Sequence, residues 1–137
     1  MPNKLQKSYF MLKKFWKDIH WDEDIYTLAN EMHSQELREY YLIITEEDML
    51  AGHSQDFHFD EDGIPVIPSY IDVEEQRLVY YPISIGQYGL AIWDTWLRTG
   101  DDADLSRFVN IADWFAENCE CDERLGCYWV TEVEKPA

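Results

Sequence analysis

The fold is decided by residues 82–100, which read PISIGQYGLAIWDTWLRTG. Apolar residues recur there at helical spacing, at Ile85, Tyr88, Ile92 and Trp96. Pro82 suits the first turn of a helix, and Gly100 suits the left-handed position just past the last turn. The stretch therefore predicts a mostly buried helix that begins at Pro82 and ends before Gly100.

A second helix is predicted immediately after Gly100. Asp101 or Asp102 can cap its N-terminus, and an apolar face follows at helical spacing, formed by Leu105, Phe108, Val109, Ala112, Phe115, Ala116 and Cys119. Because the junction at Gly100 is only a few residues long, the two helices must run antiparallel. Residues 83–119 are therefore predicted to form an αα-hairpin.

Two glycines, Gly86 and Gly89, lie inside the first of these helices on adjacent turns. A glycine within a helix costs about 1 kcal/mol relative to alanine. Such a cost usually indicates that a neighbouring segment or a ligand comes close. We expect a close approach at this position.

The other segments are shorter, and the 137 residues indicate a single domain or a fragment of one. Residues 1–50 are predicted to hold helices over 4–19 and 21–32 and a strand over 39–45. Residues 51–82 form an acidic loop and hairpin region, and 120–137 form a short hairpin that turns at Gly126, with a strand over 128–131. The predicted fold class is mainly α with short β-hairpins.

The charge is strongly negative, with 28 acidic against 11 basic residues and a net charge of −17. Nucleic acid is therefore an unexpected partner. Five of the basic residues precede residue 20, which predicts a solvated helix face docked on an acidic body, with a basic membrane-surface helix as the alternative. No apolar run is long enough to span a bilayer and no signal peptide is evident, so the expected location is cytoplasmic.

No metal or cofactor is predicted. Cys119, Cys121 and Cys127 lack a nearby fourth ligand, so reduced structural thiols are favoured over a metal knuckle. Asp60-Glu61-Asp62-Gly63 is similar to the start of a calcium loop but lacks the later ligands, which favours an acidic turn closed by glycine. The four histidines, His20, His33, His53 and His58, show no metal spacing and are expected at the surface or in loops.

Four motifs stand out in the sequence, namely YPISIGQYGL at 81–90, TGD at 99–101, ADWFAEN at 112–118 and the preceding FDEDGIP at 59–65. Together they resemble the D-glucuronyl C5-epimerase family, at the opening of its helical catalytic domain. The resemblance covers about residues 57–119. It implies a partial (α/α) toroid, a ring of αα-hairpins of which residues 83–119 would be one.

The resemblance also implies an isomerase that inverts C5 of glucuronic acid within a polysaccharide, by removing a proton and returning it from the opposite face. In the family these roles go largely to tyrosines and a glutamate, helped by arginine, in a later part of the domain. A ring of twelve helices needs well over 200 residues, so we expect this chain to be a portion or a reduced relative, and whether it is itself an enzyme stays open. An exposed apolar face predicts a homo-oligomer or a completing partner chain.

Tyr81, Gln87 and Tyr88 are the predicted substrate-binding residues, with scaffold roles as the alternative reading. No catalytic residue is assigned within the chain. The acidity of residues 20–137 disfavours a strongly polyanionic substrate. It leaves open two alternatives, a less charged glycan that contains uronic acid and a basic groove supplied by the missing portion of the domain. The competing function is a non-catalytic carbohydrate-binding or assembly module, favoured by the absence of a recognisable paired acid/base motif.

Overall fold

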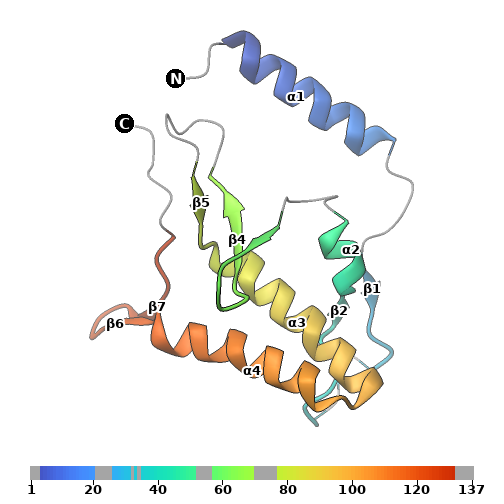
Figure 1. Ribbon diagram of the computed structural model, residues 1–137, viewed down its shortest axis with the longest axis vertical. Coiled ribbons are helices and arrows are strands. Elements are labelled where there is room, and N and C mark those ends of the chain that lie inside the picture. The colour runs from blue at the N-terminus through green and yellow to red at the C-terminus, as the bar shows by residue number, and fades with distance from the viewer. Residues whose placement is uncertain are drawn as a thin grey trace.

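A computed structural model of the chain describes residues 4–20, 26–31, 33, 35–51, 57–69 and 77–131. In these residues the protein is mainly α with short antiparallel β-strand pairs, as predicted (Figure 1). The helices are α1 (Lys4–Ile19), α2 (Glu46–Leu50), α3 (Pro82–Thr99) and α4 (Asp102–Glu117). The strands are β1 (Thr27–Leu28), β2 (Leu42–Ile43), β3 (His58–Phe59), β4 (Pro65–Pro68), β5 (Leu78–Val79), β6 (Glu120–Asp122) and β7 (Gly126–Tyr128).

The predicted αα-hairpin is confirmed as α3 and α4, which lie side by side and antiparallel (Figure 1). Pro82 occupies the first turn of α3. Gly100 has φ 68°, the left-handed conformation, and its amide donates to the Trp96 carbonyl at 2.7 Å. The Asp101 carboxylate then caps α4 by accepting from the Ala103 amide at 2.9 Å. Local residue chemistry therefore sets both ends of the turn.

The hydrophobic core lies on the inner side of α3, between α4, α2 and the β3–β4 turn. Its buried members are Met49, Ile64, Ile85, Tyr88, Ala91, Ile92 and Ile111. On α4 the predicted apolar face is only partly correct, because Val109, Ala112 and Ala116 are exposed and the buried residue is Ile111. Among the described residues, α3 is the main packing partner of α4, so the opposite side of α4 is left exposed.

The helix predicted over 21–32 is wrong where the structure describes it. Thr27 and Leu28 form β1, which pairs with β2 in the antiparallel register Thr27↔Ile43 and Leu28↔Leu42. The Ala29 amide continues this pairing by donating to the Tyr41 carbonyl at 3.1 Å. A strand partner fourteen or more residues away therefore overrides the local helical spacing. Residues 21–25 and 32 lie outside the described residues.

Strands β3, β4 and β5 form an antiparallel meander that packs beside α3. The β3–β4 turn is the acidic turn that was predicted. Asp60 accepts from the backbone amides of Asp62 at 3.0 Å and Ile64 at 2.8 Å, and Gly63 has φ 78°. The strand predicted over 39–45 is also confirmed, although β2 is limited to residues 42–43.

The predicted C-terminal hairpin is present as β6 and β7, with Gly126 at φ 77° after the turn. Its second strand covers 126–128 and not the predicted 128–131. Trp129 leaves the strand because its indole N–H donates to the Phe115 carbonyl at 2.7 Å and its ring packs edge-on against Phe115. This contact fixes the hairpin to the end of α4.

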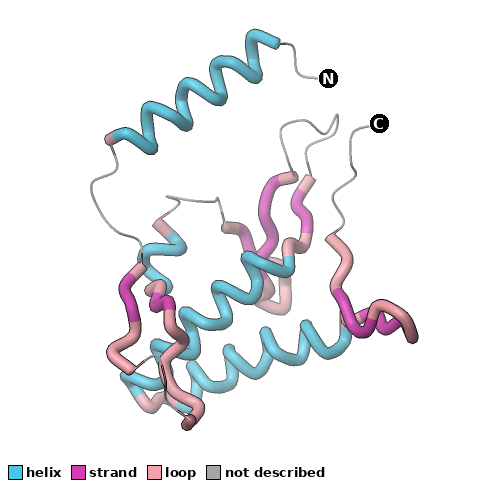
Figure 2. Tube along the Cα trace, turned by 180° about the vertical axis from the view of Figure 1, so that it is seen from behind, coloured by secondary structure: helices cyan, strands magenta, loops and turns pink. Residues whose placement is uncertain are grey.

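Helix α1 is confirmed, but its predicted docking on the acidic body is not, because it makes little contact with the other described elements. Its large apolar side chains are 44% to 81% exposed. Both ribbon views show α1 set apart from the α3–α4 pair (Figures 1 and 2). Among the described residues, no helix is both long enough and apolar enough to cross a membrane.

Candidate functional site

A cavity of about 210 Å³ opens where α3, α4 and the β3–β4 turn meet. Its walls combine apolar and polar side chains, namely Phe59, Asp62, Gly63, Tyr88, Ile92, Arg107, Asn110 and Ile111. Pockets for drug-sized ligands measure roughly 300–1,000 Å³, so this cavity suits one small ring or a short polar group.

The polar side of the cavity is built around the Tyr88 hydroxyl. Arg107 donates to this hydroxyl from Nη2 at 3.0 Å, and the hydroxyl lies 3.4 Å from Oε2 of Glu46. The two N–H-bearing ends of the Arg107 guanidinium contact the two Glu46 oxygens, Nη1 to Oε1 at 3.3 Å and Nη2 to Oε2. This bidentate pair orients the guanidinium and, through it, the phenol.

Each member of this network is placed by its own helix. Tyr88 and Ile92 are one turn apart on α3, and Arg107 and Asn110 share a face of α4 at i and i+3. Glu46 begins α2, which Thr45 caps by accepting from the Asp48 amide at 3.1 Å. The network therefore joins three helices.

Charge and burial keep Tyr88 protonated and Arg107 ionised. Burial raises the pKa of Tyr88, with the Glu46 charge adding to the rise and Arg107 opposing it. The hydrogen bond to Glu46 raises the pKa of Arg107 above its ordinary value. At neutral pH the cavity thus presents a neutral phenol and a guanidinium whose charge is already balanced by Glu46 and by Asp104, 3.1 Å from Nη1.

Side-chain hydrogen bonds hold the β3–β4 turn, which lines one side of the cavity, to α4 and to Tyr80. The Asn110 side-chain amide donates to the Asp62 carbonyl at 2.8 Å, which holds the acidic turn against α4. Behind the turn, the Tyr80 hydroxyl donates to Asp60 Oδ2 at 2.7 Å. Desolvation pushes the pKa of Asp60 upward, but the hydrogen bonds from Tyr80 and the amides of Ile64 and Asp62 outweigh it and hold the pKa below its ordinary value.

The three predicted binding residues do not come together. Tyr88 is buried and lines the cavity. Gln87 is exposed, and Tyr81 is the half-buried N-cap residue of α3; neither belongs to the cavity walls. Tyr81 and Tyr88 are seven positions apart in the chain, which is about 10 Å along the helix axis.

Sequence reasoning missed Glu46, Arg107, Asn110 and Phe59. The i, i+3, i+4 spacing of Arg107, Asn110 and Ile111 was a usable signal, because it places a cation, an amide and the buried Ile111 on one face. No local signal existed for Glu46, which is 61 residues from Arg107.

A second cavity of about 250 Å³ lies between the segment 36–40 and the α3–α4 pair. Leu90, Trp93 and Phe108 line it from the helices, and the Trp93 indole N–H donates to the Arg38 carbonyl at 3.1 Å. Arg38 itself pairs with Glu36 at 2.6 Å. This cavity is predominantly aromatic and apolar.

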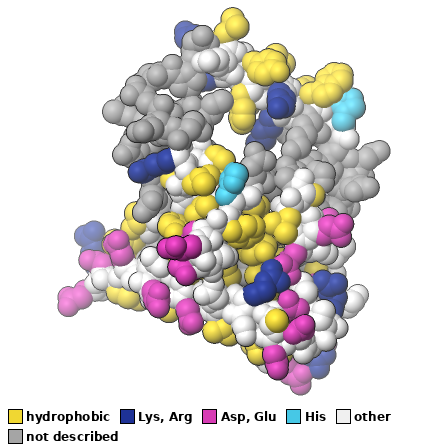
Figure 3. All heavy atoms as spheres, viewed as in Figure 1, with side chains coloured by type: hydrophobic (Ala, Val, Ile, Leu, Met, Phe, Trp, Pro, Cys, Tyr) yellow, Lys and Arg dark blue, Asp and Glu magenta, His cyan; other side chains and the backbone are white. Residues whose placement is uncertain are grey.

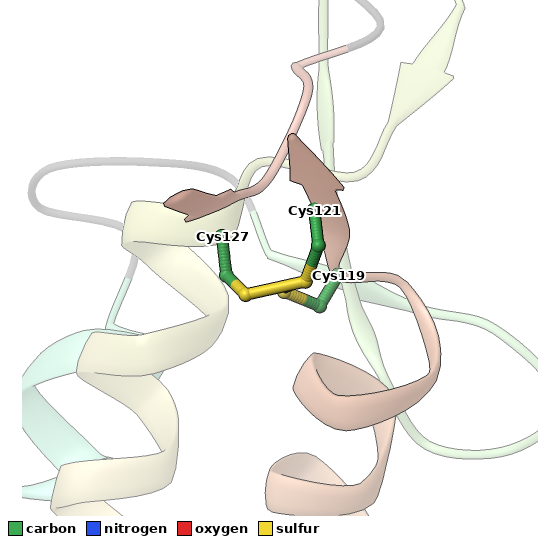
Figure 4. Close-up of side chains that lie close together, drawn as sticks. All are labelled: Cys119, Cys121 and Cys127. Atoms are coloured by element: carbon green, nitrogen blue, oxygen red, sulfur yellow. A yellow bond between two sulfur atoms is a disulfide. The ribbon is translucent and has the colours of Figure 1, made fainter. Parts of the chain in front are cut away.

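The prediction of three reduced thiols is wrong for two of the cysteines. Cys121 and Cys127, directly opposite in the β6–β7 register, form a disulfide, and Cys119 is a free thiol (Figure 4). An antiparallel pair brings opposite side chains close enough to bond. His20, His33 and His58 are exposed as expected, and His53 lies outside the described residues.

The fold and the site define a small acidic αα-hairpin protein with a cavity of mixed polar and apolar lining beside its two main helices. Figure 3 shows the acidic side chains spread over the α4 and β6–β7 side of the molecule. Comparison of the chain with protein-family models, with curated proteins and with solved structures found no match.

Proposed function

We propose that the chain is a D-glucuronyl C5-epimerase-like carbohydrate-active domain that binds one sugar ring of a uronic-acid-containing glycan in the Tyr88 cavity. The observation that carries the proposal is the convergence of the Tyr88 hydroxyl, the Arg107 guanidinium and the Asn110 amide on one cavity beside the Phe59 ring. Sugar recognition needs hydrogen-bonding groups for hydroxyls together with an apolar ring for the sugar face.

The electrostatics favour a glycan of low charge. Arg107 faces Glu46 and Asp104, so a sugar carboxylate must compete with two existing carboxylate partners. Hydroxyl groups carry no such penalty, because they donate to carboxylates as readily as they accept from the guanidinium. A neutral or sparsely carboxylated glycan therefore fits better than a sulfated one.

Inversion at C5 is the reaction that the family resemblance suggests for this domain. It needs an acid and a base on opposite faces of the sugar and a cation near its carboxylate. Tyr88, which is protonated at neutral pH, is the candidate proton donor, and Arg107 is the cation in the cavity wall, available to a sugar carboxylate only in competition with Glu46 and Asp104. The α3–α4 hairpin would be one unit of the (α/α) toroid, with the opposing base contributed from elsewhere in a complete ring.

The test measures binding and chemistry separately. Chemical-shift changes of the full chain are recorded on titration with a glucuronate-containing disaccharide, and C5–hydrogen exchange into deuterated water is followed in the same samples. Tyr88→Phe and Arg107→Gln should weaken binding by about tenfold or more, which corresponds to roughly 1.4 kcal/mol. Arg124→Gln, an equal charge change in the distant β6–β7 turn, should not.

The outcomes separate the two parts of the proposal. Exchange at C5 that Tyr88→Phe abolishes supports the epimerase-like reading. Saturable binding without exchange supports a carbohydrate-binding module. Absence of binding for every uronic-acid glycan tested rejects the proposal.

Helix α1 favours assembly as a second candidate function. Its exposed apolar side chains share the helix with lysines, whereas the rest of the chain is strongly acidic. A second copy offers both an acidic surface and exposed apolar residues, so α1 would dock on a neighbouring molecule. Light scattering should then show an oligomer that Phe15→Glu and Trp16→Glu in α1 convert to a monomer; a monomeric parent chain would remove this candidate.

A further inference from the structure

The cysteine cluster at the end of α4 brings three sulfur atoms together. Cys119 follows the C-cap of α4, Cys121 lies in β6 and Cys127 lies opposite it in β7. All three Sγ atoms fall within 4.8 Å of one another, and the Sγ atoms of Cys119 and Cys121 are 3.9 Å apart. Figure 4 shows the Cys119 sulfur beside the Cys121–Cys127 disulfide.

These distances match those of a thiolate metal site. Sulfur ligands lie about 2.3 Å from zinc, so two sulfurs on one tetrahedral ion are roughly 3.8 Å apart. The Cys119–Cys121 pair already has this spacing. Once the disulfide is reduced, Cys121 and Cys127 need only side-chain rotation to separate by the same amount, because the hairpin backbone holds them opposite each other.

The surroundings favour a cation. The negative end of the α4 dipole points toward Cys119, and the last turn of α4 has no basic residue. Four acidic residues surround the cluster in the sequence, Glu117, Glu120, Asp122 and Glu123, against one basic residue, Arg124. Reactive cysteine nucleophiles occupy electropositive environments, which is the opposite of this arrangement.

We propose that Cys119, Cys121 and Cys127 form a three-sulfur site for a thiophilic d¹⁰ cation, Zn²⁺ or Cu⁺. The site binds the cation when the Cys121–Cys127 disulfide is reduced and does not bind it when the disulfide is present. Reduction by a thiol or phosphine takes two electrons and two protons and yields two thiols. Binding of the cation then displaces the thiol protons as the sulfurs ligate it. Three soft ligands with a remaining position for water suit Zn²⁺, and three-coordinate sulfur suits Cu⁺.

The test uses the full chain, reduced under nitrogen with a phosphine that is then removed. Zn²⁺ is titrated against a chromophoric chelator, and Cu⁺ is titrated against a copper(I)-specific chelator in a separate arm. One equivalent of at least one ion should bind the reduced chain, with sulfur-to-metal charge-transfer absorption for Cu⁺. The oxidised chain, with a single thiol left, should bind neither ion under the same conditions.

Cys119→Ser is the decisive variant because it leaves the disulfide intact. Loss of a group that only hydrogen-bonds to a metal ligand weakens metal binding roughly 10–100-fold. Because Cys119 itself would be a ligand, Cys119→Ser should weaken binding to the reduced chain by more than that. Circular dichroism before reduction checks that the variant is folded, and Glu123→Gln is the control for local charge. Binding that is unchanged in Cys119→Ser, or no one-to-one binding of either ion to the reduced chain, overturns the proposal.

Discussion

Gly89 of α3 lies directly against Ile111 of α4. A Cβ atom built on Gly89 would be 2.8 Å from Ile111 Cγ2, closer than real side chains approach, whereas one on Gly86 would be 3.5 Å from the Phe115 ring. Ile111 is buried, and its Cγ2 is attached directly to Cβ, so it has little freedom to move away. The glycine at 89 therefore sets how closely the two helices pack.

The two glycines should respond in opposite directions to alanine. Gly86→Ala meets only ordinary contact and gains helix propensity, so the free energy of unfolding should rise by about 0.5–1 kcal/mol. Gly89→Ala gains the same propensity but overpacks the core, for a net loss of about 1–2 kcal/mol. Urea unfolding of the two variants checks this, and two losses of equal size would contradict it.

The Arg107–Glu46 pair should show strong coupling. Arg107→Gln leaves the Glu46 carboxylate, whose side chain is 18% exposed, without its guanidinium and should cost about 1–2 kcal/mol of stability. Adding Glu46→Gln should recover part of that loss, because the uncompensated charge is removed. Strictly additive losses in this double-mutant cycle would show that Arg107 and Glu46 do not stabilise each other.

Arg38→Gln is the control, because Arg38 belongs to an exposed ion pair. It should change stability by less than about 0.5 kcal/mol.

Asp60 should make stability depend on acid pH. Its pKa is lowered below the ordinary 3.8, so the carboxylate stabilises the fold above that value. This contribution is lost as pH falls below 3.8 and through the folded-state pKa. Asp60→Asn should therefore be less stable than the parent chain at neutral pH, and the difference should shrink at low pH. A difference that does not vary with pH would contradict the assignment, and Glu61→Gln in the same turn is the control.

Reduction of the disulfide should loosen the β6–β7 hairpin without unfolding the helices. The bridge closes a short loop of sequence separation 6, and such a loop contributes about 2 kcal/mol in the chain-entropy picture. Its strands are exposed, whereas the core lies around α3. Hydrogen exchange should speed up at residues 120–128 and stay unchanged in α3. Uniform acceleration across both regions would show that the hairpin and the helices unfold as one unit.

The αα-hairpin, the acidic turn and the C-terminal hairpin were predictable because each depends on residues close together in the chain. Pro82, Gly100 and Asp101 act on their own backbone or on that of near neighbours. The failure at Thr27–Leu28 has the opposite origin, since its partner β2 is contributed by a separate segment. The burial of the predicted apolar face of α4 was overestimated. Helical spacing shows which apolar residues share a face, but it does not show whether another segment covers that face.

The sequence by itself thus determined the two main helices, their antiparallel order and the presence of Tyr88 on the first of them. Only the tertiary structure decided that Tyr88 meets Arg107 and Glu46, that Tyr81 and Gln87 stand apart from them, and that Cys121 bonds Cys127. Helix caps and turns depend on contacts between residues a few positions apart, so they can be predicted from the local sequence. The network of Tyr88, Arg107 and Glu46 joins side chains up to 61 residues apart, which meet only when burial of Ile85, Ile92 and Ile111 packs the helices together.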